Sequence, residues 1–590
     1  MILQALQAYY QRLADLDSNA ISPEGWIDKG IDYVIEVYDD DRYLVNCLQR
    51  LEGAKRKPGP NQRLPNIGKQ ALKHTNSGKD ANLLWDKSEF VLGLGGKGAI
   101  KLVSFVSEIN HWFGDIEDEG ITAVVRFLNR IGTSPDEKQL LLQLPEHGPV
   151  LETGAPIVTF SYFKDDGGLV CHRPAVRRQY ELLCSKSKDG PRGTCLISGE
   201  HDASIQLSHP VIKNVWGGQT SGGAIISFNK RSFESYGKAD LQGQNAPVSE
   251  AAAFAYTTAL NQLLSTGSRQ RIQVGDASTV FWAEQHSDLE DDFALLFGEP
   301  RKDDPEHGTD RVKALHESVR AGKYLSDTDG KARFYVLGLA PNAARIAVRF
   351  WHVDTVAGIS GKIATHFNDL DIAHAVHEPD VLSLFRLLAA CALQGKADNI
   401  PPNLGGDVMR AVLQGSAYPQ TWLQAAVRRN RAEQSVSYPR AAVIKACLNR
   451  LIRSRPTGEK ELTVSLDETN SNTAYRLGRL FSTLEKIQEE ANPGLNATIR
   501  ERYYGAASSS PVTVFTTLMR LKNHHLAKLE NRGRAMNFER LIGEIMSGLN
   551  DFPAQLPIAE QGRFAIGYYH QRQAFYTKTV KNIESEGETK

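Results

Sequence analysis

The chain has 590 residues, and its 69 Lys and Arg residues balance its 69 Asp and Glu residues, so the formal net charge is zero. A chain of this length buries more than one hydrophobic core, which predicts two or three domains. Zero net charge excludes general basicity as an argument for nucleic-acid binding, so any such binding must come from local basic patches.

The N-terminal segment predicts an amphipathic helix. Its apolar side chains recur at helical spacing on one face, at Ile2, Leu3, Leu6, Tyr10 and Leu13. The segment lacks the charged start and the cleavage site of a signal peptide, and no apolar stretch has the length of a membrane span. Six cysteines without a CxxC pair argue against zinc and against a disulfide framework. We therefore expect a cytoplasmic protein without a metal, a cofactor or a membrane contact.

Residues 51–79 form the first basic patch, with seven Lys or Arg residues and one acid, Glu52. Several Pro and Gly residues predict a loop there. At its end, amide and hydroxyl side chains that hydrogen-bond base edges stand beside charges that bind phosphates. We expect motif-reading contacts with DNA from Lys73, Thr75, Asn76, Ser77, Gly78 and Lys79. A solvated surface loop is the alternative.

Residues 93–98 read Gly-Leu-Gly-Gly-Lys-Gly and fit the GxGxxG pattern of dinucleotide-binding proteins. An apolar trio, residues 90–92, precedes them, and Asp115 lies near the distance at which such sites place an acid. No second parallel strand follows, so a flexible loop is the simpler interpretation and a dinucleotide-dependent enzyme the alternative. The sequence has no Walker A, HExxH or GxSxG motif, and we expect no catalytic residues.

The most informative stretch begins with a polar loop of residues 216–223, which we call the glycine loop. Glycine puts no side chain between the backbone amides and another polymer, which suits close approach to DNA. Residues 224–228 predict a short buried strand, and a basic exit follows. We expect motif reading from Gly217, Gly218, Gln219, Thr220 and Ser221. Contacts with the DNA backbone are expected from Lys230 and Arg231.

Hairpin patterns recur through the first half of the chain. They cover residues 156–174 with a turn at Asp166, residues 271–283 with a turn near Gly275, and residues 333–352. A helix opened by Ser249 is expected between the first two hairpins. From about Asp380 onward strand patterns fade and helical patterns dominate. The fold class is therefore α+β, with a mixed domain of α-helices and β-hairpins at residues 1–375 and a helical bundle at residues 376–590.

The predicted bundle carries two blocks of basic residues, which we expect to hold a phosphate backbone. Its candidate residues are Arg428, Arg429, Arg431, Arg453, Arg520 and Lys522. A solvated helix face is the alternative interpretation.

Several segments resemble the large subunit of the type I-C CRISPR Cascade complex. They are the opening MILQALQAYYQRLAD, then KHTNSGKDANLLWDKSEFVLGLG, the ordered series SHPVIK, GGQTSGGAIISFN, FESYGK and NAPVSEAAAFAYTTALN, and the tail from residue 472 to residue 526. The resemblance covers nearly the whole chain. Its anchors are weakest between residues 284 and 333.

The resemblance implies a non-catalytic subunit that reads the protospacer-adjacent motif on duplex DNA, promotes R-loop formation, binds the displaced strand and helps to recruit a helicase-nuclease. The implied partners are CRISPR RNA, the backbone and guide-RNA-processing subunits, and a small subunit. Residues 464–590 would also be made separately as that small subunit, from a non-standard start codon at Val464. A scaffold subunit with little DNA reading of its own is the alternative.

Overall fold

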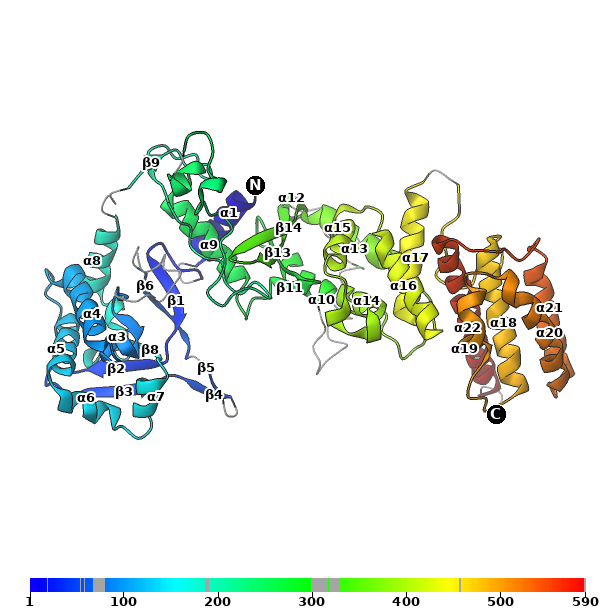
Figure 1. Ribbon diagram of the computed structural model, residues 1–590, viewed down its shortest axis with the longest axis horizontal. Helices are drawn as coiled ribbons and strands as arrows, with labels where there is room; N and C mark the ends of the chain where they lie inside the picture. Colours follow the sequence, from blue (N-terminus) through cyan, green and yellow to red (C-terminus); the bar gives the residue numbers. More distant parts are fainter. Residues whose placement is uncertain are drawn as a thin grey trace. The chain divides into compact units, whose positions relative to one another are not determined.

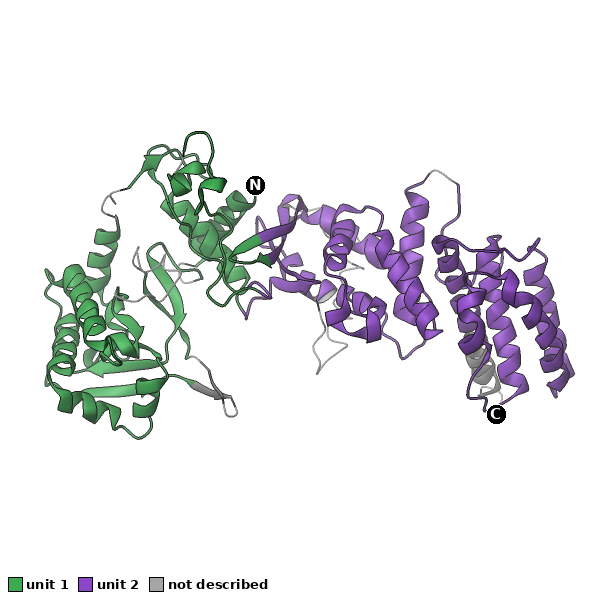
Figure 2. Ribbon diagram, viewed as in Figure 1, with its two compact units in different colours: residues 1–214, 218–265, 341–346 green, residues 215–217, 266–340, 347–590 purple. Residues whose placement is uncertain are grey.

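The computed structural model describes residues 1–17, 20–52, 55–57, 59–66, 80–185, 190–238, 240–298, 317, 328–455 and 458–587. The chain forms two compact units (Figure 2). Unit 1 comprises Met1–Asn214, Gly218–Ser265 and Pro341–Ile346, and unit 2 comprises Val215–Gly217, Thr266–Ala340 and Ala347–Lys590. The fold is α+β, with small sheets in the first half of the sequence and helices in the second (Figure 1).

Unit 1 is built on a four-stranded sheet in the order β3-β2-β8-β7. The strands are β2 (Tyr33–Val37), β3 (Tyr43–Cys47), β7 (Trp85–Lys87) and β8 (Ile157–Tyr162). β2 and β8 are parallel, and the other pairs are antiparallel. Among the described residues of unit 1, three antiparallel pairs lie outside this sheet. They are β1 (Trp26–Gly30) with β6 (Asn61–Pro65), β4 (Arg50–Glu52) with β5 (Lys55–Lys57), and β9 (Arg192–Gly193) with β10 (Ala203–Ser204).

Six helices of unit 1 share one hydrophobic core with this sheet. They are α3 (Ser88–Val91), α4 (Gly98–Phe113), α5 (Glu119–Thr133), α6 (Pro135–Leu142), α7 (Gly148–Thr153) and α8 (Pro174–Ser185). Phe105 of α4, Phe127 of α5 and Phe160 of β8 meet in the core. The expected N-terminal helix is confirmed as α1 (Ile2–Leu16), and it packs against α9 (Glu250–Leu263) (Figure 1).

The hairpin expected at residues 156–174 forms only in its first strand, β8. The chain then turns through Phe163–Asp165 and Val170–His172, two short 3₁₀ segments, and keeps a single antiparallel bridge between Ser161 and Leu169. Arg173 explains this path, because its guanidinium donates to Asp118 and Asp165 and so ties the returning chain to the start of α5. Side-chain ion pairs replace the expected second strand.

Unit 2 contains a four-stranded sheet in the order β11-β12-β13-β14. Its strands are β11 (Arg271–Val274), β12 (Ala277–Ala283), β13 (Arg333–Asn342) and β14 (Arg345–Thr355). The expected turn at Gly275 and the expected strands over residues 333–352 are confirmed. β13 and β14 each contribute a short end to unit 1.

Helices pack on this sheet in one continuous core. They are α10 (Leu289–Phe297), α13 (Val356–Leu370), α14 (Leu384–Cys391), α15 (Leu404–Gln414), α16 (Gln420–Glu433) and α17 (Tyr438–Arg453). Phe281 of β12, Leu387 of α14 and Ile444 of α17 all belong to this core. The two compact units divide near Ser265, whereas the sequence predicted a boundary near residue 375. The structure has no division at residue 375 because strands and helices on both sides of it share one core.

The last helices of unit 2 form a bundle with a second core. They are α18 (Thr473–Ala491), α19 (Ile499–Ala507), α20 (Val512–Lys528), α21 (Arg532–Met546) and α22 (Ile558–Gly587). Phe481 of α18 lies among Tyr504, Phe515 and Phe564 in this core. No helix in the described part of the chain is both long and apolar enough to cross a bilayer.

Candidate nucleic-acid interface

The first predicted DNA-contacting segment cannot be placed. Lys73, Thr75, Asn76, Ser77, Gly78 and Lys79 lie outside the described residues, so their role stays a prediction.

The glycine loop is exposed to solvent along residues 216–221. Within unit 1 its base is closed by a pair of backbone hydrogen bonds between Ile212 and Gly223, each 2.9 Å long. Gly222 has φ +90°, and a Cβ atom there would lie 2.8 Å from the carbonyl oxygen of Ile212. Only glycine fits this position without strain, so the loop ends at a fixed point.

Gln219 lies in a tight turn of the glycine loop. The Gly222 N–H donates to the Gln219 carbonyl oxygen at 3.0 Å, and the Ser221 hydroxyl lies 3.5 Å from the Gln219 side-chain oxygen. The side chains of Gln219, Thr220 and Ser221 are exposed. They offer the amide and hydroxyl groups that hydrogen-bond base edges.

Trp216 is the exposed aromatic residue of the same loop and belongs to unit 2. The residue is 58% exposed, and its backbone N–H donates to the Ser278 hydroxyl at 2.8 Å. The ring lines a hollow of about 400 Å³ together with Phe297 and Leu388. Trp216 is therefore an exposed apolar residue at the start of the glycine loop.

Residues 224–228 are not the buried strand that the sequence predicts. They are half-buried, and Ala224 forms one parallel bridge with Arg345. Arg345 then holds the segment through its side chain, donating to the Ser227 carbonyl oxygen and to Asn229 Oδ1, both at 3.1 Å. One backbone bridge and this guanidinium therefore hold the segment in place of regular strand pairing.

The two basic residues of the exit differ in their surroundings. Lys230 is exposed and forms no ion pair with a described residue. Arg231 is also exposed, and its guanidinium donates to Asp240 at 2.7 Å. This surface pair costs little to break, because solvent screens both charges.

A loop of residues 229–247 follows, which we call the tyrosine loop. Its tip carries Tyr236, which is 98% exposed. The sequence interpretation used the string FESYGK only for the family resemblance and assigned Tyr236 no role. An aromatic residue between polar residues and next to Gly is the signal that could have indicated an exposed ring.

The arginines predicted along α16 and α17 are not equivalent. Arg428 is exposed and forms no ion pair with a described residue, and the exposed Arg431 reaches the Ser509 hydroxyl at 3.4 Å. Arg429 is only 16% exposed and pairs with Glu433. Burial opposes ionisation of Glu433, yet hydrogen bonds and charge from Arg429 and Arg440 lower its pKa below the usual value.

Arg453 belongs to a second internal network. It pairs with Asp369, a buried residue of α13 that also accepts from Arg450 at 2.7 Å. The Arg450 guanidinium lies 4.0 Å from the ring centre of Tyr418 and donates to the Ala411 carbonyl oxygen. The network ties α13, α15 and α17 together.

The basic residues predicted in α20 also differ. Arg520 is exposed, and no described residue pairs with it. Lys522 is 10% exposed and pairs with Glu539 of α21 at 2.9 Å. The structure thus leaves Arg428, Arg431 and Arg520 available on the surface and ties Arg429, Arg453 and Lys522 to carboxylates.

Three buried histidines each hydrogen-bond a buried tyrosine. The pairs are His209 with Tyr256 at 2.6 Å, His366 with Tyr418 at 2.5 Å, and His570 with Tyr475 at 2.9 Å. Burial lowers the pKa of His209 to about 4 and those of His366 and His570 to about 3. These imidazoles are neutral near pH 7, and each hydrogen bond joins two buried side chains through the Nδ1 atom of the histidine.

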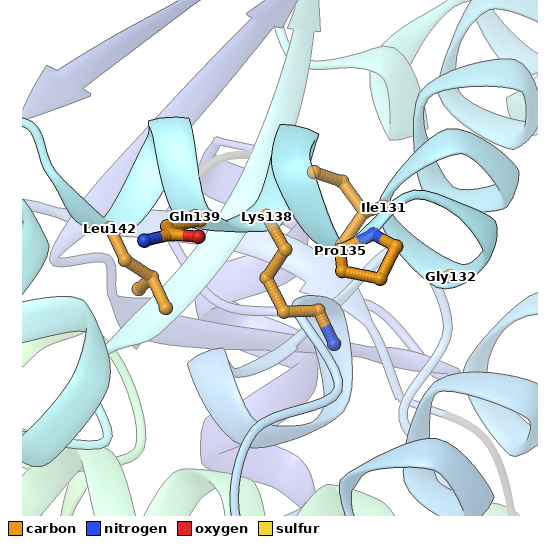
Figure 3. A pocket seen from close by; sticks show the side chains of 6 residues that line it. All are labelled: Ile131, Gly132, Pro135, Lys138, Gln139 and Leu142. Atoms are coloured by element: carbon orange, nitrogen blue, oxygen red, sulfur yellow. The ribbon is translucent and has the colours of Figure 1, made fainter.

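The structure contradicts the context that a dinucleotide site needs at residues 93–98. Phe90 and Val91 lie in the short helix α3 instead of a strand. Lys138 of α6 donates to the Gly93 carbonyl oxygen at 3.1 Å and lines a hollow of about 260 Å³ (Figure 3). Apolar and amide side chains make up most of this lining, without an acid for a ribose. In the described part of the chain, no group of His, Cys, Asp or Glu could hold a metal ion.

Comparison with known proteins agrees with the resemblance seen in the sequence. The model of one protein family, described as CRISPR-associated protein (Cas_Csd1), matches residues 6–576. A search of curated proteins found no match to the chain. Because the matched residues cover nearly the whole sequence, the chain belongs to the Cas_Csd1 family of CRISPR-associated proteins.

Proposed function

We propose that the chain is the non-catalytic large subunit of a type I-C CRISPR RNA-guided surveillance complex, or Cascade. In this role it recognises the protospacer-adjacent motif in duplex DNA, promotes R-loop formation, binds the displaced strand and helps to recruit the helicase-nuclease. Its partners would be CRISPR RNA and the other Cascade subunits. The family match supports a CRISPR role with other CRISPR components as partners.

The observation that carries motif reading is the exposed glycine loop on its fixed base. Backbone hydrogen bonds at Ile212 and Gly223 hold the ends of its unit 1 portion, so little ordering is needed on binding. Glycines let such a loop enter a narrow groove, and Gln219 supplies an amide for a base edge. Residues 73–79 are the second proposed contact.

Strand support is proposed for the exposed arginines of the helices. Arg428, Arg431 and Arg520 are accessible to phosphates. Contacts of this kind hold nucleic acid without reading its sequence. Arg429, Arg453 and Lys522 would bind DNA only after leaving their carboxylate partners, so we expect weaker contributions from them.

Separate synthesis of the last helices is part of the proposal. α18 to α22 have their own hydrophobic core, which supports independent folding of residues 464–590. Tyr475 of α18 and Tyr569 of α22 also belong to the core shared with α16 and α17. The face that carries these two tyrosines would therefore dock a separate fragment against the rest of unit 2. Mass spectrometry of the expressed complex should find a fragment that begins near Val464, and its absence would refute this part.

The test of motif reading is duplex binding by the reconstituted complex, with and without this subunit, on targets that differ only in the flanking motif. We expect omission to abolish discrimination, and Gln219→Ala and Lys73→Ala each to reduce it about tenfold. Gln139→Ala is the matched control, because Gln139 is an exposed glutamine of α6 outside the proposed interface. If the complex without this subunit still discriminated between flanking motifs, the chain would be a scaffold and not the reader of the motif.

A further inference from the structure

Tyr236 occupies a backbone conformation that bulky residues avoid. Its φ is +55°, and Gly237 follows with φ +72°, so two consecutive residues are left-handed. A residue with a side chain is strained in this region and keeps the conformation only where the surroundings impose it. The conformation turns the chain sharply and leaves the ring 98% exposed, with both faces in solvent.

The rest of the tyrosine loop imposes that conformation. Asn245 accepts the Ser235 N–H at 3.3 Å and donates to the carbonyl oxygens of Lys238 at 3.1 Å and Gln242 at 2.9 Å. The Lys238 ammonium donates to the Gln244 carbonyl oxygen at 3.2 Å. Asn245 therefore holds the backbone on both sides of Tyr236, so the position from which the exposed ring projects is pre-organised.

Cations lie in the same loop. Lys230 is exposed, and Arg231 is exposed beside Asp240. The Arg345 guanidinium lies 3.9 Å from the ring centre of Phe233, so that aromatic face is already occupied. Glu234 is used within the loop, where it accepts the Asp240 N–H at 2.7 Å. Tyr236 is thus an open aromatic ring in the same loop as the exposed cations Lys230 and Arg231.

The ring fits a nucleobase better than a protein partner. A protein hot spot is a ring surrounded by a rim that excludes water. The sequence neighbours Ser235, Gly237 and Lys238 are not apolar side chains, and the partly exposed Phe233 and Leu241 of the same loop leave Tyr236 98% exposed. Stacking of an unpaired base needs one flat ring and a nearby cation. We propose that Tyr236 stacks on an unpaired nucleobase of the nucleic acid held by this subunit. The inference rests on the proposed function and adds a base-stacking position to it.

The test uses the reconstituted complex and a target whose displaced strand is held open in a bubble. Tyr236→Ala should weaken binding about tenfold, and Tyr236→Phe should keep the affinity within about twofold, because the phenyl ring retains the stacking face. Val376→Ala is the matched control, since Val376 is a fully exposed apolar residue of unit 2. Equal losses for the Ala and Phe variants would overturn stacking.

Base dependence gives a readout that loop damage would not produce. Abasic nucleotides placed singly along the strand should reveal one position at which Tyr236→Ala has no further effect, because the two changes remove the same contact. At that position 2-aminopurine fluorescence should be quenched with wild-type protein and recover with Tyr236→Ala. Additive losses at every position would refute the proposal.

The outcomes also separate this inference from the proposed function. If the wild-type complex discriminates between flanking motifs and the Tyr236→Ala complex binds the bubble target as tightly as the wild type, only the stacking proposal fails. If omission of the subunit leaves discrimination intact, the proposed function fails and the inference fails with it. Parallel abasic scans of the DNA strands and of the guide RNA identify which strand supplies the base.

Discussion

The tyrosine loop and the helices from α16 to α22 differ in how they use basic residues. In the loop Lys230 is exposed and Arg231 has one screened surface partner. In the helices Arg429, Arg453 and Lys522 pair with carboxylates from the same or neighbouring helices. The number of basic residues in a segment therefore says little about the charge that a ligand can reach.

The difference arises from packing. Helices bring residues that are distant in the sequence side by side, so an arginine meets acids that no local pattern reveals. Arg453 and Asp369 are an example, because 84 positions separate them. In the tyrosine loop, Arg231 pairs with the nearby Asp240 and Lys230 pairs with no described residue, so these cations stay at the surface. The predictions below test this contrast, beginning with the largest expected effect.

Glu485 is the carboxylate on which the last bundle depends most. It is fully buried in α18 and accepts from Thr498 at 2.7 Å, from Tyr568 at 2.7 Å and from Arg572 at 3.0 Å. Glu485→Ala should lower the free energy of unfolding by about 3–5 kcal/mol, because it leaves buried donors unpaired. Urea unfolding measures this loss.

Glu489→Ala is its matched control. Glu489 is 24% exposed and pairs with the same Arg572 at 3.2 Å. Its loss should cost about 1 kcal/mol or less. Similar losses for the two variants would mean that the bundle does not depend on buried pairing, and the contrast with the loop would disappear.

His209 should make the unit that carries the tyrosine loop sensitive to acid. Burial lowers its pKa from 6.5 to about 4 in the folded protein, so below pH 6.5 the unfolded chain binds more protons than the folded chain. Stability is therefore complete above pH 6.5 and falls as the pH drops toward 4. We expect a loss of about 2 kcal/mol between pH 7 and pH 5 from this histidine.

His209→Gln should flatten that dependence, whatever it does to stability at pH 7. His201→Gln is the control, because His201 lies in an exposed turn. Urea unfolding at pH 7 and pH 5 gives the slope for each protein. If His209→Gln kept the wild-type slope, the acid sensitivity would have to come from other groups.

Arg428 and Arg429 give the smallest and most direct test, because they are neighbours on one helix. Arg428→Ala should weaken binding of all sequences equally and reduce the salt slope of log K by about 1, as expected for one lost phosphate contact. Arg429→Ala should leave the slope unchanged and reduce stability by about 1 kcal/mol or less. If a salt titration showed a smaller slope for Arg429→Ala and an unchanged slope for Arg428→Ala, ion pairing would not restrict the access of phosphates to an arginine.

The sequence predicted features whose cause is local. Ser249 accepts the Ala252 N–H at the start of α9, as its capping side chain requires. Gly275 turns β11 into β12 with φ +61°, as a tight hairpin turn requires. Helical periodicity beyond residue 380 also indicated the helices correctly.

The features that the sequence did not predict depend on distant partners. Residues 224–228 contact Arg345, which lies more than 100 positions away in the sequence. The region after β8 is held by the ion pair between Arg173 and Asp118. The candidate site divides in the same way. Glycine and polar residues indicated the exposed glycine loop, but no local signal told Arg428 from Arg429. Tyr236 was missed although a local signal was present, an aromatic residue between polar residues and next to Gly237.

The three histidine–tyrosine pairs provide spectroscopic reporters of folding. Each pair holds a hydroxyl or imidazole proton away from water, and such protons resonate apart from the rest of an NMR spectrum. His209 reports on the region around α9, His366 on the sheet-and-helix core of unit 2, and His570 on the junction between α18 and α22. Their exchange rates with solvent would measure the opening of each region separately. A ligand that orders one region alone would slow one exchange rate and leave the other two unchanged.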